Sequence, residues 1–261
     1  KNPRLYEPRA AIGNEEIKYL VKVIRSKWIG TGPVTEKFEN KFKKYKKAKY
    51  CLSVNSCTAA LHLSLLSMKL KKGDEVITTP MTFASTINSI ILAGGKPVLA
   101  DIDKDTYNIN PENIEKKITK KTKGILLVHL AGLPCEIERI NKIKKKYNLF
   151  LIEDCAHGIE TKYNNIHVGN FGDTGCFSFY STKNLTTGEG GMIISKDKKI
   201  ANKIRVLRLH GLSKDAWKRN LPAAVKFSSK FEHYDVTEVG LKYNLIDINS
   251  AIGLVQLKKI E

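Results

Sequence analysis

Short apolar segments alternate with longer helix-like segments along most of this chain, and the alternation constrains its fold more than any other feature. The apolar segments have the length of strands. They are residues 50–54, 75–78, 98–101, 124–129, 149–153, 175–180 and 192–195. Helices are predicted at 14–24, 34–47, 59–69, 83–93, from 111, and at 136–147, 198–209 and 247–260. Apolar strands separated by helices predict a mostly parallel sheet covered on both faces, which is a three-layer α/β/α fold.

The net charge raises the question of the partner. At 261 residues the chain is long enough for one large α/β domain, and its formal net charge is +19. That charge fits a nucleic-acid binder, a membrane-surface protein or an enzyme for phosphorylated substrates. Only seven of the 45 basic residues are arginine, the residue that base readout and bidentate phosphate contacts favour. Because the lysines are scattered along the chain, we interpret the charge as a lysine-rich composition and predict no nucleic-acid or membrane partner.

The cysteines indicate a reducing compartment. The five of them, at positions 51, 57, 135, 155 and 176, form no Cys-x-x-Cys pair and lie mostly in apolar segments. This pattern is typical of buried thiols in a cytoplasmic protein without a metal site. No signal peptide or apolar run long enough to cross a membrane is present.

Polar residues follow several of the predicted strands. In parallel sheets, ligands bind beyond the carboxyl ends of the strands. This rule predicts that residues 56–58, residues 82–83, His129, Asp154 and residues 178–183 form the rim of one crevice.

Lys183 lies on a short connection between two predicted strands, followed by glycines at 188, 190 and 191. Burying an ammonium there is costly unless it is paired or deprotonated, and a deprotonated lysine amine forms Schiff bases with carbonyls. The alternative is an ordinary exposed loop lysine.

Together, the rim residues suit pyridoxal 5′-phosphate (PLP). Lys183 offers an amine for the aldehyde, and Asp154 offers a carboxylate for the pyridinium nitrogen. Residues 56–58 and Ser178 offer amides and hydroxyls for the phosphate at a helix start, and Phe83 offers a flat face for the ring. Taken singly, these residues also fit purely structural roles: a helix cap at 56–58, a core aromatic for Phe83 and a structural ion pair for Asp154.

The sequence also resembles a known family. The motifs are Trp28 to Pro33, Asn55 to His62, Pro80 to Thr86, Glu153 to His157, Phe177 to Gly191 and Tyr243-Asn244. In these it resembles the sugar aminotransferases of the DegT/DnrJ/EryC1/StrS family, PLP enzymes of the aspartate-aminotransferase fold type. The resemblance covers nearly the whole chain.

The resemblance implies a role for each site residue. Lys183 corresponds to the Schiff-base lysine that moves the proton, Asp154 to the partner of the pyridine nitrogen, and His157 to a residue beside the ring. The phosphate and ring contacts correspond to Cys57 (through its backbone), Thr58, Ser178 and Phe83. Asn244 corresponds to an asparagine that reaches the cofactor phosphate of the neighbouring subunit, which implies a homodimer with shared sites. Glu189 and His210 fall in family motifs with possible substrate roles.

The resemblance further implies a nucleotide-linked keto sugar as substrate and L-glutamate as amino donor. The stretch from Lys183 to Gly191 resembles enzymes that aminate C4. The run His210 to Trp217, with Tyr243-Asn244, resembles those that use UDP-4-keto sugars. Amination of a 3-keto sugar is the alternative within the family.

The family also implies a division of the chain. Residues 1–30 are expected to form an N-terminal arm and helix, residues 31–240 the large PLP-binding domain, and residues 241–261 the start of a helix leading to a small C-terminal domain not present in this sequence. Residues 210–240 lack clear periodicity, which predicts a functional loop or a mobile segment.

Three other functions compete with this prediction. Family members that dehydrate keto sugars carry histidine at the Schiff-base position, where this chain has Lys183. A scaffold that keeps the cofactor fold without turnover is the second. A basic nucleic-acid-binding or regulatory protein is the third, and it leaves the placement of Lys183 and Asp154 unexplained.

Overall fold

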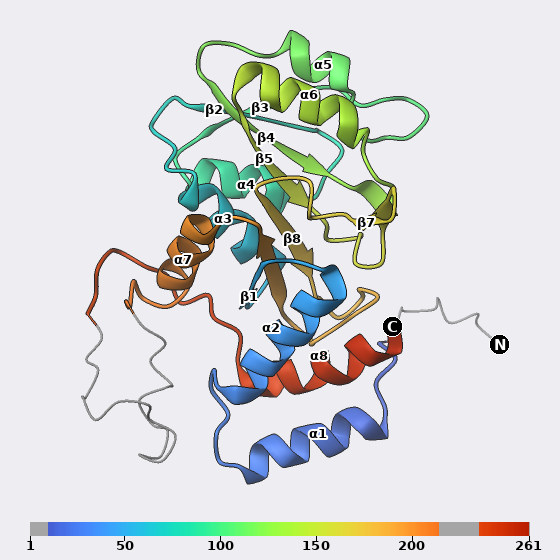
Figure 1. Cartoon of the computed structure of the whole chain (residues 1–261), viewed down its shortest axis with the longest axis vertical. Coiled ribbons are helices and arrows are strands. Elements are labelled where there is room, and N and C mark those ends of the chain that lie inside the picture. Colours follow the sequence, from blue (N-terminus) through green and yellow to red (C-terminus); the bar gives the residue numbers. More distant parts are fainter. Residues whose placement is uncertain (1–9, 214–234, 261) are drawn as a thin grey trace, which may run out of the picture.

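The computed structural model describes residues 10–213 and 235–260 and shows a three-layer α/β/α fold (Figure 1). The strands are β1 (Tyr50–Val54), β2 (Glu75–Thr78), β3 (Lys96–Leu99), β4 (Thr122–Val128), β5 (Phe150–Asp154), β6 (Lys162–Tyr163), β7 (Ile166–His167), β8 (Thr174–Ser178) and β9 (Gly191–Ser195). The α-helices are α1 (Asn14–Arg25), α2 (Pro33–Lys46), α3 (Cys57–Ser67), α4 (Ala84–Leu92), α5 (Pro111–Lys116), α6 (Ile137–Tyr147), α7 (Lys198–Leu207) and α8 (Asp247–Ile260), and Leu130–Gly132 forms the 3₁₀ turn η1. The predicted fold class is therefore confirmed.

The main sheet has seven strands in the order β1-β9-β8-β5-β4-β2-β3. All neighbouring pairs are parallel except those that involve β9, which runs antiparallel to both β1 and β8. The sheet is thus mostly parallel, as predicted, and β9 alone runs in the opposite direction.

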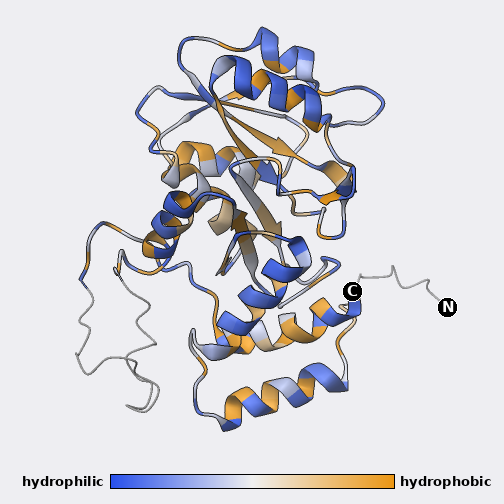
Figure 2. Ribbon diagram, viewed as in Figure 1, coloured by the Kyte–Doolittle hydropathy of each residue, from blue (hydrophilic) through white to orange (hydrophobic). Residues whose placement is uncertain are grey.

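Side chains alternate between the two faces of this sheet. Leu126, Ile152 and Ile193 point to one face, where they pack with apolar residues of α3, α4 and α7. Their neighbours along each strand point to the other face. Figure 2 shows largely apolar strands flanked by helices that carry both apolar and polar residues.

The second face is covered by two groups of helices. Over β8 and β9, aromatic residues of α2 pack with Phe177 and Phe179 and with leucines of α8. Over β2, β4 and β5, isoleucines of α5 and α6 close the core. Figure 1 shows the two groups at opposite ends of the molecule.

The start of α2, which follows Trp28 to Pro33, is hydrogen-bonded to the start of α8. Gly32 occupies the N-cap of α2 and has no side chain with which to cap the helix. Asp247 takes that role: its Oδ1 accepts the Thr35 amide at 2.9 Å and its Oδ2 accepts the Val34 amide at 3.2 Å. A Cβ on Gly32 would lie 2.2 Å from Trp28 Nε1, so this close approach requires glycine.

Several element boundaries differ from prediction. β3 is Lys96–Leu99 rather than 98–101, and α3 begins at Cys57, two residues earlier than predicted. The β6–β7 hairpin was not predicted; its turn is formed by Asn164 and Asn165, both with positive φ.

Much of the long loop predicted at 210–240 lies outside the described residues, as do residues 1–9 of the N-terminal arm. Among the helices that the structure describes, none has the length and apolar character needed to span a membrane.

Candidate active site

The strand register brings the predicted rim segments to one edge of the sheet. Asp154, the last residue of β5, pairs with Val128 on one side and Cys176 on the other. Ser178 ends β8 and pairs with Gly191, which in turn pairs with the last residue of β1. The loop from β1 to α3, the end of β5 and the connection from β8 to β9 therefore all start at this edge.

Asp154 is a buried carboxylate held by neutral donors. Its Oδ1 accepts the Ala156 amide at 3.0 Å and lies 3.9 Å from the Cys57 thiol sulfur, while its Oδ2 accepts the Thr86 hydroxyl at 3.3 Å. Burial raises the pKa of Asp154 above its ordinary value of 3.8, and these hydrogen bonds only partly offset the rise. Within residues 10–213 and 235–260 it forms no ion pair, so the carboxylate is arranged to receive a cation.

The N-terminus of α3 lies beside this carboxylate. Ser56 caps the helix through a bond from the Ala59 amide to its Oγ at 3.1 Å. This bond leaves the amides of Cys57 and Thr58 without an acceptor in the described part of the chain. Free amides at a helix start form a phosphate site, assisted by the helix dipole.

Gly191 supports that helix start. A Cβ at this position would lie 2.6 Å from the Ser56 carbonyl and 2.8 Å from the Cys57 amide nitrogen. The backbone of β9 therefore packs directly against the turn that presents the amides.

Lys183 is half-buried on the connection between β8 and β9. The connection is closed by the bond from the Phe179 amide to the Gly190 carbonyl at 2.9 Å, and Asn184 anchors it by donating to both oxygens of Glu160 at 3.1 Å. The ammonium of Lys183 acts on two side chains that also sense Asp154. Burial and the Asp154 carboxylate raise the pKa of the Cys57 thiol, and Lys183 opposes them.

His157 is the second of these side chains. Burial lowers the pKa of its imidazole, the Lys183 ammonium lowers it further, and the Asp154 carboxylate acts in the opposite direction. Because the effect of a charge falls with distance, Lys183 and Asp154 both lie near His157. Its Nδ1 accepts the Ala131 amide at 3.3 Å, so the neutral ring carries its proton on Nε2.

The other predicted residues lie around this group. Phe83 occupies the N-cap position of α4 and is 80 % exposed. Thr58 is exposed on the first turn of α3, and the Ser178 hydroxyl accepts the Tyr180 amide at 3.4 Å. Asn244 forms a β-bridge with Val54, which places its backbone next to the loop that leads into α3.

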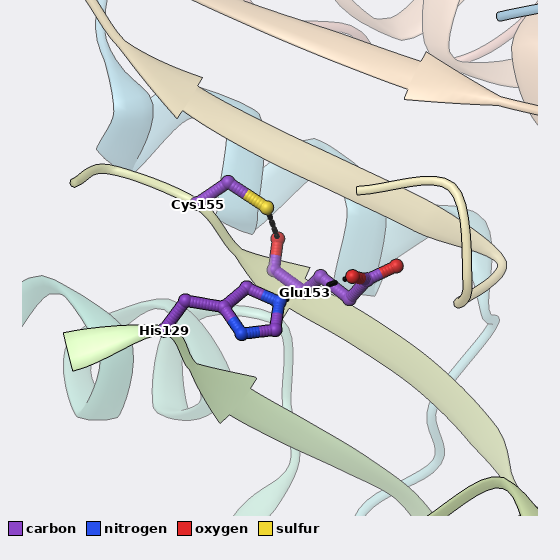
Figure 3. Close-up of side chains that lie close together, drawn as sticks. All are labelled: His129, Glu153 and Cys155. Carbon is purple, nitrogen blue, oxygen red and sulfur yellow. Dashed lines mark hydrogen bonds and ion pairs between the residues drawn. The ribbon is translucent and has the colours of Figure 1, made fainter. Parts of the chain in front are cut away.

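The prediction that His129 lies on the rim is wrong. Its side chain points to the same face as Leu127 and is fully buried, with Nε2 3.1 Å from Glu153 Oε2. Strand alternation explains this, because His129 and Glu153 point to the face opposite Asp154. Figure 3 shows the His129 ring directed at Glu153.

The cluster of His129, Glu153 and Cys155 has the donor types of a metal site, with ligand atoms within 4.8 Å of one another. Its donors already have partners, however. His129 Nδ1 accepts the Cys135 amide at 3.1 Å, so the ring donates to Glu153 through Nε2. Glu153 also accepts the amides of Gly169, Phe171 and Gly172 at 2.6–2.8 Å. The cluster is a satisfied structural network.

Sequence reasoning did not identify Thr86 as a partner of Asp154. Thr82 lies just before the N-cap of α4 and Thr86 lies on its first turn, and their hydroxyl oxygens lie 2.7 Å apart. No local sequence pattern indicates the contact with Asp154.

The residues present fit PLP. Asp154 offers a buried carboxylate that has no ion-pair partner among the residues described, and the first amides of α3 offer a cradle for the phosphate. Lys183 adds a half-buried amine close enough to act on the same side chains as Asp154. The model of the DegT/DnrJ/EryC1/StrS aminotransferase family matches residues 10–261.

The chain belongs to the DegT/DnrJ/EryC1/StrS aminotransferase family. An uncharacterized protein of Methanocaldococcus jannaschii is 52 % identical over 254 residues, which cover 97 % of this chain and 64 % of that relative. The spore coat polysaccharide biosynthesis protein SpsC of Bacillus subtilis is 45 % identical over 251 residues, 96 % of this chain and 63 % of SpsC. The chain thus spans less than two thirds of the length of either relative.

Solved structures agree with this membership. The PMP form of a putative sugar aminotransferase from Streptococcus pneumoniae superposes with a TM-score of 0.86 at 32 % identity, covering 97 % of this chain and 67 % of that one. A PLP form of the same protein is also known. The enzymes of this DegT family depend on PLP, as the sequence predicts.

Proposed function

We propose that the protein transfers an amino group from L-glutamate to a nucleotide-linked keto sugar, at C4 of a UDP-4-keto sugar. The family, the polysaccharide role in the name of SpsC and the likeness to a sugar aminotransferase of known structure support a sugar substrate. The C4 position rests on the resemblance of the stretch from Lys183 to Gly191. The UDP group rests on that of His210 to Trp217 with Tyr243-Asn244, and the L-glutamate donor rests on the family as a whole. Asp215 to Trp217, which entered that prediction, lie outside the described residues.

One observation carries the proposal: a buried carboxylate without an ion-pair partner in the described chain shares its surroundings with a half-buried lysine. Asp154 ends β5, which pairs with β8, and Lys183 lies on the connection that leaves β8 at the same edge of the sheet; the two groups act with opposite signs on Cys57 and His157. A carboxylate that keeps a heterocyclic nitrogen protonated and an amine that carries protons are the two groups that PLP-dependent amino transfer requires.

Each residue of the site has its own proposed role toward PLP. PLP, when bound, supplies a carbonyl that takes up the amino group and a protonated ring that draws electrons away from the reacting carbon. Asp154 holds the proton on the ring nitrogen, and the amides of Cys57 and Thr58, with Ser178, bind the phosphate. Phe83 covers one face of the ring. The Lys183 Nζ accepts and returns the proton at the reacting carbon, a transfer worth about 10²–10⁴-fold in rate.

His157 orients the ring from the side. Its proton lies on Nε2 because Nδ1 accepts the Ala131 amide, and Nε2, which has no partner among the described residues, can donate to the phenolic oxygen of PLP. We propose this donation as its role.

We also propose a cytoplasmic homodimer. Asn244 from one subunit reaches the phosphate in the other, and the five free cysteines suit a reducing compartment.

The test uses the full-length protein. Wild-type protein purified with PLP is expected to be yellow, to lose the colour with L-glutamate and to be labelled by borohydride at Lys183. A Lys183→Ala variant is expected to be inactive. If this variant aminates a keto sugar at the wild-type rate, the proposed mechanism is wrong.

Substrate identity is tested separately with UDP-, GDP- and dTDP-linked 4-keto and 3-keto sugars, read by mass spectrometry. Product from a 3-keto sugar alone replaces C4 by C3 amination. The rival nucleic-acid function predicts binding that falls steeply with salt.

A further inference from the structure

The two oxygens of the Asp154 carboxylate are held differently. Oδ1 accepts the Ala156 amide from its own turn and lies near the weak Cys57 thiol donor. Oδ2 has one partner in the described chain, the hydroxyl of Thr86 on the first turn of α4. The orientation of Oδ2 therefore depends on a residue from another layer of the fold.

The direction of these hydrogen bonds follows from the chemistry of the groups. A carboxylate only accepts, so the Thr86 hydroxyl must give its proton to Asp154. Its oxygen is then free to accept from the Thr82 hydroxyl, 2.7 Å away. The result is a directed chain from Thr82 through Thr86 to Asp154, in which each bond strengthens the next.

Burial makes this chain effective. Thr86 is fully buried and Asp154 is 5 % exposed, so water cannot easily replace the hydroxyl. Other titratable groups near the carboxylate include Cys57 from α3, Cys155 and His157 after β5, Cys176 from β8, His129 after β4, and Lys183 on the connection from β8 to β9. None of these contacts Oδ2 by a hydrogen bond within residues 10–213 and 235–260.

We propose that Thr86 is a positioning residue that orients the Asp154 carboxylate toward the pyridine nitrogen of PLP and keeps it ionised. This inference rests on the proposed function, because it needs a cofactor nitrogen opposite Asp154. Thr82 supports Thr86, and because Phe83 lies between them in sequence, one turn aligns the carboxylate and carries the ring-stacking aromatic.

The test compares PLP affinity among variants of the full-length protein by equilibrium titration, with absorbance of the bound cofactor as a second readout. Thr86→Val keeps the shape and removes the hydroxyl. Loss of a hydrogen bond to a charged group predicts roughly tenfold weaker PLP binding and an altered absorbance spectrum. Thr86→Ser restores the hydroxyl and is expected to restore both.

A double-mutant cycle separates positioning from general damage. If Thr86 acts through Asp154, Thr86→Val adds little further loss in an Asp154→Asn background. Thr78→Val is the matched control: it removes a buried hydroxyl that donates to the Leu126 carbonyl at 2.8 Å, away from Asp154, and is expected to bind PLP like wild type.

Each outcome decides between the claims. Wild-type affinity in Thr86→Val, or a full additional loss in the Asp154→Asn background, overturns the role of Thr86 and leaves the proposed function standing. Wild-type protein that binds no PLP overturns the proposed function itself. Should Thr86→Val fail to fold, Thr82→Val weakens the same chain and is expected to give a smaller loss in the same direction; wild-type affinity there also overturns the role.

Discussion

Two consecutive residues, Glu153 and Asp154, have carboxylates that point to opposite faces of the sheet, and the different surroundings on the two faces give the two charges different roles. Glu153 faces the layer of α5 and α6, where the His129 ring and three amides surround it. Burial alone would raise its pKa, but these donors outweigh burial and lower it. Asp154 faces α3 and α4, where fewer donors leave its pKa raised. The Glu153 charge therefore stabilises the fold, whereas the Asp154 carboxylate can still accept a hydrogen bond from a ligand.

Neutralising each carboxylate is therefore expected to have opposite results. Asp154→Asn removes a buried charge that costs stability, so PLP-free protein is expected to be as stable as wild type or more stable, by up to about 1 kcal/mol. Its turnover is expected to fall at least about 10²-fold because the ring nitrogen loses its partner. Urea denaturation and steady-state kinetics measure the two effects.

Glu153→Gln serves as the comparison. It replaces the carboxylate that accepts from the His129 ring and three amides by a neutral amide, and is expected to lose roughly 1.5–3 kcal/mol of stability. Wild-type rates in Asp154→Asn would remove Asp154 from the mechanism, and equal stability losses in the two variants would refute the distinction.

Lys46 gives a pH-dependent prediction. Its fully buried ammonium donates to the Ile159 carbonyl at 3.0 Å and lies 4.3 Å from the centre of the Phe177 ring. Burial lowers its pKa from the ordinary 10.5 to about 8. Between these two pH values the unfolded chain binds more protons at this site, so the site contributes stability that rises with pH.

A Lys46→Met variant removes that dependence. Its stability relative to wild type is expected to be most favourable at pH 7 and to decline by about 3 kcal/mol as pH rises through 8 toward 10.5. Urea denaturation at pH 7 and pH 10 measures the free energy of unfolding of the variant and of the wild type. The other titrating groups are the same in both proteins, so their contributions cancel in the difference between the two. A difference that stays constant with pH would contradict the assignment.

At the scale of elements, α2 depends on a cap supplied from 212 residues away in sequence. Asp247→Ala removes the acceptor for the Thr35 and Val34 amides and leaves the buried Thr35 hydroxyl with one partner fewer. We expect a loss of about 2–3 kcal/mol by thermal or urea denaturation.

The matched control is Asp197→Ala at the exposed N-cap of α7. Asp197 accepts the Lys199 and Ile200 amides of its own helix, so its loss is expected to cost only about 1 kcal/mol. Equal losses in the free energy of unfolding for Asp247→Ala and Asp197→Ala would show that the long-range cap stabilises the protein no more than an ordinary local cap.

Sequence patterns predicted the strands and helices well because apolar periodicity is local. They placed His129 on the rim because strand ends are uncertain by a residue, and one residue reverses the face to which a side chain points. At the start of α1, Gly13 occupies the N-cap and its amide donates to the Glu16 carboxylate at 2.9 Å. The bond from Thr86 to Asp154 and the cap from Asp247 join distant segments, which no local pattern reports.

At the scale of the whole molecule, the proposed shared site makes a prediction about mixtures. Lys183→Ala and Asn244→Ala are each expected to be impaired alone. In a two-fold dimer, a mixed pair contains one site with both residues intact, so reassembling equal amounts is expected to restore roughly a quarter of wild-type activity.

Wild-type dimers diluted with inactive protein calibrate that activity measurement. If mixing the two variants restores no activity, Asn244 acts in the site of its own subunit. The division of the chain at residues 30 and 240, with a small domain to follow, stays a prediction beside this one.

The antiparallel direction of β9 determines where the connection that carries Lys183 leaves and re-enters the sheet. Because β9 runs against β8, the connection that carries Lys183 leaves and re-enters the sheet at the same edge, fixed at both ends within residues 179–190. A parallel neighbour would require a crossover of a dozen or more residues that starts and finishes at opposite edges. The connection that carries Lys183 is thus held at both ends by the sheet and tied through Asn184 to Glu160, so loops that do not contact it can diverge while this amine keeps its place.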